Sequence, residues 1–191
     1  MPYIIIGLVI VVGAVLLLYG CKKQSIQAEN SAESDKSVDN PYEGLRNMAI
    51  STTPKDLQLD LPTDSTVVFG TLMEIGMDEA VVTMVTYLTG DASIYFSTGG
   101  GVIGGGHHQS VNDAAVQFMQ ISQTYLDKTK KTQSTPLPET DNVIFYFLTN
   151  KGIFVGKDQM KNIMNNSSVW SDLFAEGNVV MNELRLLTEQ K

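Results

Sequence analysis

The chain has 191 residues, 43% of them hydrophobic, which is enough for one domain with a core of its own. Thirteen Lys and Arg against 21 Asp and Glu leave a formal net charge of -8, which repels phosphate backbones and argues against nucleic acid as a partner. The single cysteine, Cys21, excludes an intrachain disulfide and any zinc site with several cysteines.

The first predicted element is an uncharged apolar run at residues 3–20, YIIIGLVIVVGAVLLLYG. As a helix it would span about 27 Å, close to the thickness of a bilayer core, so we expect one transmembrane helix. Lys22 and Lys23 follow the run and no basic residue precedes it, so the positive-inside rule places the remaining chain on the cytoplasmic side. The alternative is a lipoprotein anchored at Cys21, because the segment LLYGC loosely resembles a lipobox. The missing basic residues before the apolar run disfavour that alternative.

Residues 21–40 are polar and hold too few large apolar side chains to form a core, so we expect a flexible acidic linker there. An α+β domain is expected at residues 41–191. It opens with a short helix that starts at Asn40-Pro41 and runs through Ile50, followed by about one helical turn after Thr53-Pro54.

The middle of the domain is predicted to form strands, because β-branched and aromatic residues recur there between short turn signals. Five strands are expected at residues 66–75, 80–88, 92–96, 143–148 and 153–155. An amphipathic helix capped by Ser110 separates the third strand from the fourth, and a last helix runs from about Ser168 to Leu187. This order predicts a single antiparallel five-stranded sheet, covered by two main helices plus short N-terminal helices and preceded by the transmembrane helix.

A glycine-rich loop at residues 97–106, STGGGVIGGG, is the most unusual stretch of the sequence. It formally matches the pattern Gly-x-Gly-x-x-Gly and leads into a helix N-terminus, where free amides bind phosphates or carboxylates. A dinucleotide site would need a parallel strand-helix-strand unit, which the predicted order lacks. We therefore interpret the loop as a tight structural crossover, with ligand or partner binding as the alternative. The candidate residues for that alternative are Ser97, Gly99, Gly100, Gly101, Gly104, His107, His108 and Ser110.

His107 and His108 are the only histidines of the chain. Adjacent side chains usually point in different directions and no cysteine lies nearby, so we expect neither a metal site nor a cofactor. Ser97 lacks the Gly-x-Ser-x-Gly setting of a hydrolase nucleophile. Because the sequence contains no catalytic motif, we favour a protein that is not an enzyme.

Charge is distributed unevenly along the domain. Residues 41–126 carry two basic and nine acidic side chains, a balance of 2 minus 9, or -7, whereas residues 127–191 carry eight of each. The acidic half favours a basic protein partner or high solubility. Lys128, Lys130 and Lys131 follow a predicted helix, and we interpret them as compensation of its dipole, with contact to anionic lipid as the alternative.

Residues 95–106, YFSTGGGVIGGG, resemble an element of a family of uncharacterised bacterial proteins, in which a serine and three glycines follow a strand. The resemblance extends from about Asn40 to Leu187 and includes residues 40–46, NPYEGLR, and 147–152, FLTNKG. It implies a bacterial origin and an intact domain, and transfers no activity. The element order is also similar to roadblock-like and profilin-like interaction modules, although three strands instead of two precede the central helix.

These features predict a membrane-tethered, non-enzymatic protein-interaction or scaffold module on the cytoplasmic face of a bacterial inner membrane. The membrane contact is expected through residues 3–20, and the second partner is expected to be a protein of unknown identity. The alternative is a small-ligand or nucleotide-binding domain that uses the glycine-rich loop, residues 97–110.

Overall fold

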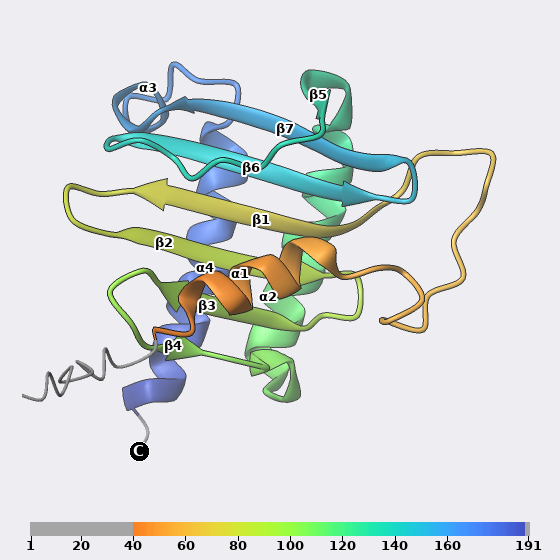
Figure 1. Ribbon diagram of the computed structural model, residues 1–191, viewed down its shortest axis with the longest axis horizontal. Helices are drawn as coiled ribbons and strands as arrows, with labels where there is room; N and C mark the ends of the chain where they lie inside the picture. The colour runs from red at the N-terminus through yellow and green to blue at the C-terminus, as the bar shows by residue number, and fades with distance from the viewer. Residues whose placement is uncertain (1–39, 190–191) are drawn as a thin grey trace, which may run out of the picture. The chain divides into compact units, whose positions relative to one another are not determined.

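Seven antiparallel strands form one sheet in the computed structural model, which describes residues 40–189 (Figure 1). They lie side by side in the order β4-β3-β2-β1-β6-β7-β5. The strands are β1 Val68–Gly76, β2 Val81–Tyr87, β3 Ala92–Phe96, β4 Gly101–Val102, β5 Lys130–Thr132, β6 Asn142–Thr149 and β7 Gly152–Gln159. The helices are α1 Tyr42–Ser51, α2 Gln109–Thr124, α3 Met160–Met164 and α4 Ser171–Glu189, with the 3-10 turns η1 Gly105–His107 and η2 Leu126–Lys128.

Short connections make neighbours of strands that follow one another in sequence, as the turn signals predicted. β1, β2 and β3 form one antiparallel meander, and β6 and β7 form a hairpin. The two groups join at the centre of the sheet, where β1 pairs with β6 and Met73 lies opposite Phe145. This arrangement confirms the predicted α+β class and the single antiparallel sheet.

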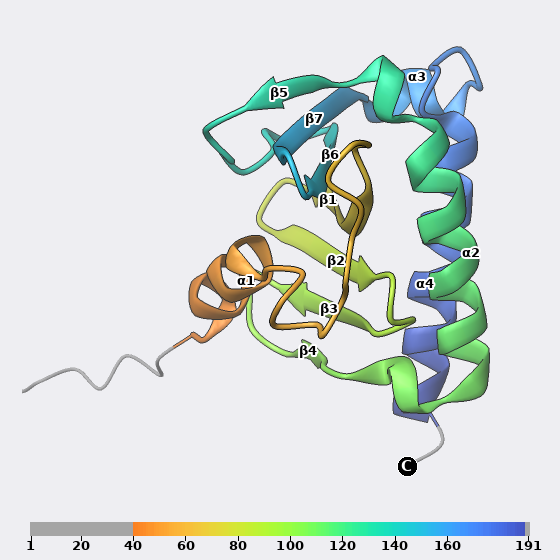
Figure 2. The same cartoon turned by 90° about the vertical axis from the view of Figure 1, so that its right-hand side faces the viewer.

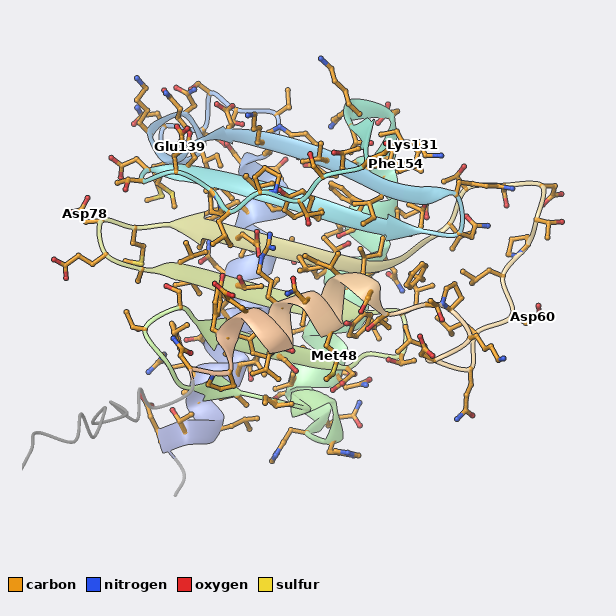
Figure 3. The ribbon with its side chains drawn as sticks, in the orientation of Figure 1. Met48, Asp60, Asp78, Lys131, Glu139 and Phe154 are labelled. Atoms are coloured by element: carbon orange, nitrogen blue, oxygen red, sulfur yellow. The ribbon has the colours of Figure 1, made fainter. Side chains whose placement is uncertain are left out.

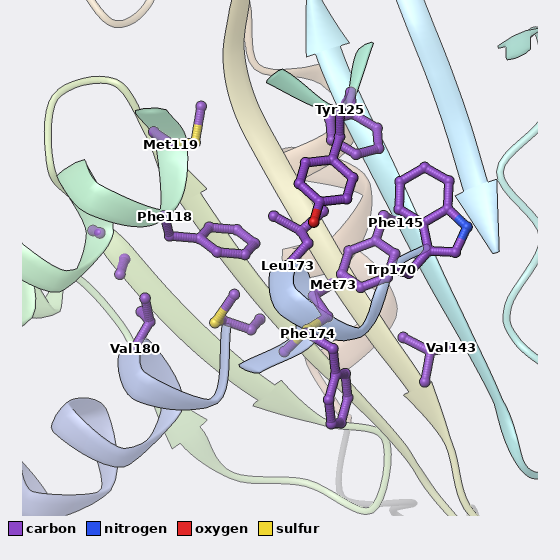
Figure 4. Packing of buried hydrophobic residues seen from close by; sticks show 14 of the residues in the cluster. Met73, Phe118, Met119, Tyr125, Val143, Phe145, Trp170, Leu173, Phe174 and Val180 are labelled. Atoms are coloured by element: carbon purple, nitrogen blue, oxygen red, sulfur yellow. The ribbon is translucent and has the colours of Figure 1, made fainter. Parts of the chain in front are cut away.

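Helices α2 and α4 lie next to each other across one side of the sheet, which we call the α2/α4 face (Figure 2). Side chains alternate between the two faces of each strand, so Met73 of β1 and Phe145 of β6 meet Phe118 of α2 and Leu173 of α4 in the main core (Figure 4). All four of these side chains are fully buried. The apolar stripes of the two helices therefore pack on this face, as their spacing predicted.

The opposite side of the sheet, the α1 face, holds a second core that is covered by α1 (Figure 2). Leu72 of β1, Val85 of β2 and Tyr146 of β6 are buried in it. Polar bonds attach the helix: the Tyr42 hydroxyl lies 2.9 Å from the Thr83 hydroxyl. β6 is buried on both faces apart from its first residue, whereas most residues of β5 and β7 are half-buried or exposed.

The predicted number of five strands is wrong, because the sheet has seven. The two strands that the sequence pattern missed are β4, with two residues, and β5, with three. Segments this short show no alternation of apolar and polar residues. Each becomes a strand only because the fold places it beside an existing edge, β4 beside β3 and β5 beside β7.

The predicted single-pass membrane topology is also corrected. Residues 3–20, for which a transmembrane helix was expected, lie outside the described residues, as do Cys21 and the linker up to residue 39. Within residues 40–189, no helix is long and apolar enough to cross a membrane. The physical reason is clearest in α4, which has 19 residues but carries several charged side chains along its length. An inner-membrane assignment has no support in the described part of the chain.

Three smaller differences concern helix boundaries. His108, and not Ser110, precedes α2, and it makes no side-chain capping bond. The second short N-terminal helix, expected after Thr53, is a turn, so α1 is the one helix described before the sheet. Helix α3, between β7 and α4, was not predicted, because five residues are too few to show a helical period.

Buried tyrosines make the fold sensitive to alkaline pH. Burial raises the pKa of Tyr87 and of Tyr146 to about 12, so the folded protein keeps both protonated above the usual tyrosine pKa of about 10. Their contribution to stability is complete below pH of about 10 and is lost as pH rises toward 12. At a pH of about 11 we expect the free energy of unfolding to be about 1 kcal/mol lower for each tyrosine than at a pH of about 9. Urea titrations at both values measure this, and equal midpoints would contradict it.

Candidate functional site

The glycine-rich loop turns the chain back on the edge of the sheet. After β3, Gly99, Gly100 and Gly101 all have positive φ, at 100°, 87° and 146°. The Gly99 amide donates to the Phe96 carbonyl oxygen at 2.8 Å, and β4 then pairs with β3, with Gly101 opposite Tyr95. A Cβ atom at Gly101 would overlap the Ile94 carbonyl oxygen. This position requires glycine because both its backbone angle and its surroundings exclude a side chain.

Two amides of this loop that could bind an anion already have acceptors within the protein. The Gly104 amide donates to the Ser93 hydroxyl, and the Gly106 amide donates to the Asp91 carboxylate, each at 3.0 Å. The Ser97 hydroxyl accepts a hydrogen bond from the Val81 amide at 2.7 Å and so ties β2 to the end of β3. These contacts favour the interpretation of the loop as a structural crossover.

Beside the loop lies a hollow of about 440 Å³, bordered by the end of α4. Of the predicted site residues, the hollow is lined by Gly101, Gly104 and His108; the remaining five do not line it. His107, His108 and Ser110 are exposed. Ligand binding by residues 97–110 therefore stays a prediction. His108 supplies the one imidazole that lines the hollow.

No cluster of three or more His, Cys, Asp or Glu side chains that could hold a metal ion occurs within residues 40–189.

A second cavity, of about 360 Å³, opens on the far edge of the sheet, between β5, β6, β7 and the start of α4. We call it the lysine pocket, and its lining residues are Lys128, Lys130, Thr132, Ser134, Pro136, Ile144, Tyr146, Val155, Gly156, Lys157 and Trp170. Its volume is at the lower end of the range typical of ligand pockets. Three lysines line the pocket, and among the described residues no Asp or Glu does.

The shape of the pocket comes from the shortness of β5. Lys130 is the first residue of this strand and pairs with Val155, so β7 has no outer neighbour in the sheet from Gly156 onward. A Cβ atom at Gly156 would overlap the ring of Trp170, so glycine is what lets the indole lie against the strand. The indole also stacks on Phe145, with 5.5 Å between the ring centroids. An aromatic ring therefore lies where the sheet is incomplete.

The outer wall of the pocket is the segment between β5 and β6, and buried polar groups hold it in place. The Tyr146 hydroxyl donates to the Pro136 carbonyl oxygen at 2.6 Å, and the Arg46 guanidinium donates to the Thr135 carbonyl oxygen at 2.8 Å. Arg46 is itself held by a bidentate ion pair with Glu74, through bonds of 2.6 and 2.8 Å. The Glu74 side chain is completely buried and also accepts a bond from the Thr83 hydroxyl at 2.9 Å. The wall is therefore fixed to the centre of the sheet.

The sequence pattern predicts a different role for the lysines at positions 128, 130 and 131. Lys128, Lys130 and Lys131 were expected at the end of a helix, but Lys130 and Lys131 lie on β5 and only Lys128 lies in a helical turn, η2. The Lys128 ammonium lies 4.0 Å from the centroid of the Tyr125 ring, a cation–π contact. The sequence does contain a signal for this pocket. Residues 128–161 have six lysines and three acidic residues, a balance of +3 in a chain of net charge -8.

Comparisons with family models, with curated proteins and with solved structures give no significant match to this chain. The resemblance of residues 95–106 to a bacterial family consequently stays a prediction.

Proposed function

We propose that this chain is a non-enzymatic interaction module that binds an acidic segment of a partner protein at the β5–β7 edge of its sheet. The observation that carries the proposal is the concentration of positive charge there. Within residues 40–189, six of the seven lysines fall between positions 128 and 161: Lys128, Lys130, Lys131, Lys151, Lys157 and Lys161. Oppositely charged patches speed association and select against wrong partners, so the sign of this edge favours an acidic partner over the basic one expected from the sequence.

Among the described residues, no acidic side chain lines the lysine pocket, although Glu139 and Asp141 precede β6 and Asp158 lies on β7. Figure 3 shows Lys131 near the β5 edge, whereas Asp60 and Asp78 lie toward opposite ends of the sheet. Residues 41–126 have a balance of -7, and they include β1 to β4 and the loop that contains Asp60. Such a separation of charge orients a partner during its approach, because the acidic parts of the domain repel the same partner that the lysines attract.

The form of the edge favours binding by side chains. A strand of another chain can pair with an exposed edge strand, and proteins prevent this pairing with short edge strands and with lysines on the edge. β5 has both features, since two of its three residues are Lys130 and Lys131. An acidic partner segment would therefore interact with the lysine side chains and with the pocket that they border, and would not extend the sheet.

Charge reversal tests the proposal. In the full-length chain, Lys130→Glu combined with Lys157→Glu reverses the charge at the pocket, and Lys55→Glu reverses one exposed lysine after α1, which is half the change in net charge of the double variant. We expect photo-crosslinking in the native host to join the wild-type chain and the Lys55→Glu variant to the same acidic protein, and the double variant to lose at least about nine-tenths of that product. Unchanged products in the double variant, or no specific product with the wild-type chain, would contradict the proposal.

A further inference from the structure

We infer that the lysine pocket binds an aromatic side chain that has carboxylates on both sides of it in the partner's sequence. The inference rests on the proposed function, because the partner supplies the segment, and it adds the chemistry by which the pocket would recognise that segment. Three features of the pocket carry it: the position of its lysines around an apolar centre, its aromatic walls, and its fixed outer wall.

The lysines lie on two sides of an apolar spot. Lys130 is directly opposite Val155 in the β5–β7 ladder, and directly opposite residues of an antiparallel pair lie on the same face of a sheet. Lys157 is two residues after Val155 on β7 and therefore also lies on that face. Both lysines are exposed and Val155 is half-buried. A segment complementary to this surface places an apolar side chain against Val155 and a carboxylate beside each lysine.

The pocket favours an aromatic group as the apolar part. Tyr146 of β6 and Trp170 before α4 line it with a small part of their surface, since they are 1% and 5% exposed, and Pro136 lines the outer side. An aromatic ring stacks on another ring in a way that an aliphatic side chain cannot, so an aromatic group suits this lining best. A volume of about 360 Å³ suits one ring with its flanking groups better than a large ligand.

The pocket is organised before its occupant binds. The segment that forms its outer wall is bonded to Tyr146 and to the buried Arg46–Glu74 pair. At the start of that segment, the Thr132 hydroxyl donates to the Ser134 carbonyl oxygen at 2.8 Å. A wall that is already ordered adds little conformational entropy loss on binding, so even a short segment can bind specifically.

Trp170 provides the readout, because it is the only tryptophan of the chain and lines the pocket. Its fluorescence is measured in the full-length protein during titration with three short blocked peptides. The first is acidic with a central phenylalanine, the second is the same peptide with alanine at the centre, and the third keeps the phenylalanine but has lysines in place of the acidic residues. We expect the first to bind at least about ten-fold more tightly than either of the others, and more weakly as salt is added.

Variants of single lysines test whether the peptide binds at the lysine pocket. Lys130→Met and Lys157→Met keep a long apolar side chain but remove the charge, and each is expected to weaken binding of the phenylalanine peptide about two- to five-fold. Lys151→Met is the matched control, because Lys151 is exposed in the β6–β7 turn and does not line the pocket, so it should bind the peptide as the wild type does. If all three variants lose the same affinity for the peptide, the overall charge of the protein explains the effect, and the inference is wrong.

The remaining outcomes separate the inference from the function on which it rests. If the alanine peptide binds as tightly as the phenylalanine peptide while crosslinking still depends on Lys130 and Lys157, the pocket chemistry is wrong and the proposed function stands. If the phenylalanine peptide binds as expected but no protein is crosslinked, the pocket chemistry stands and the proposed function fails. If phenylacetate alone binds as tightly as the peptide, the occupant is a small aryl acid, which overturns its assignment to a protein segment.

Discussion

Replacing Arg46 with alanine is expected to lower the free energy of unfolding by about 3 to 5 kcal/mol. The side chain of Glu74 is completely buried, and the substitution would leave its carboxylate with the Thr83 hydroxyl as its remaining hydrogen-bond partner. It would also remove the bond to the Thr135 carbonyl oxygen, which fixes the wall of the lysine pocket. Urea denaturation followed by circular dichroism measures the loss.

Two controls separate the buried pair from ordinary surface charge. Arg185 forms an exposed ion pair with Glu189 on α4, and Arg185→Ala is expected to change stability by less than about 0.5 kcal/mol. The double variant Arg46→Leu with Glu74→Leu should be more stable than Arg46→Leu alone, because it leaves no unpaired charge in the core. A small loss for Arg46→Ala, or no recovery in the double variant, would show that the pair does not hold α1 to the sheet.

Gly101→Ala is expected to destabilise the domain by about 2 to 4 kcal/mol, the second large effect. Gly101 has a φ of 146°, and a Cβ atom there would overlap the Ile94 carbonyl oxygen, so the β3–β4 turn would have to open. Gly100 provides the matched control in the same loop. Its φ is also positive, at 87°, but a Cβ atom would meet no atom within 4 Å, so Gly100→Ala should cost only about 1 kcal/mol.

Two further substitutions serve as stability controls, one in α1 and one beside the loop. Gly44 lies in α1 with open space around it, so Gly44→Ala should stabilise the protein by about 0.5 to 1 kcal/mol. His108 is exposed, and His108→Ala should leave stability within about 0.5 kcal/mol of the wild type. If Gly101→Ala and Gly100→Ala lose the same amount in urea titrations, the crossover interpretation of the loop is wrong.

Together, these effects separate the parts of the domain that determine its stability from the part that we propose for binding. Arg46 and Gly101 act where the chain is buried or has no room for a side chain. Lys130 and Lys157 are exposed, so their methionine variants should change the unfolding free energy by less than about 0.5 kcal/mol. Weaker peptide binding in these variants would then report on recognition and not on folding.

Local patterns were sufficient to predict the larger elements of this fold. The β-branched runs before and after the glycine-rich loop predicted β1, β2, β3, β6 and β7, because each run is long enough to alternate between two faces and short turns join the neighbours. The apolar stripes predicted α2 and α4, and Phe118 and Leu173 from those stripes are fully buried. The same patterns led to the α+β class and the antiparallel sheet.

The fold class, the main elements and the glycine positions of the loop can be predicted from the amino-acid sequence, because they depend on residues close together in the chain. That β4 and β5 are strands follows only from the folded chain, since each depends on an edge supplied by another segment. The burial of Arg46 also follows only from the folded chain, because its partner Glu74 lies on a strand 28 residues away. The lysine pocket has the same origin: Lys130, Lys157 and Trp170 belong to separate segments, and the packing of β7 between β6 and a short β5 is what brings them to one cavity.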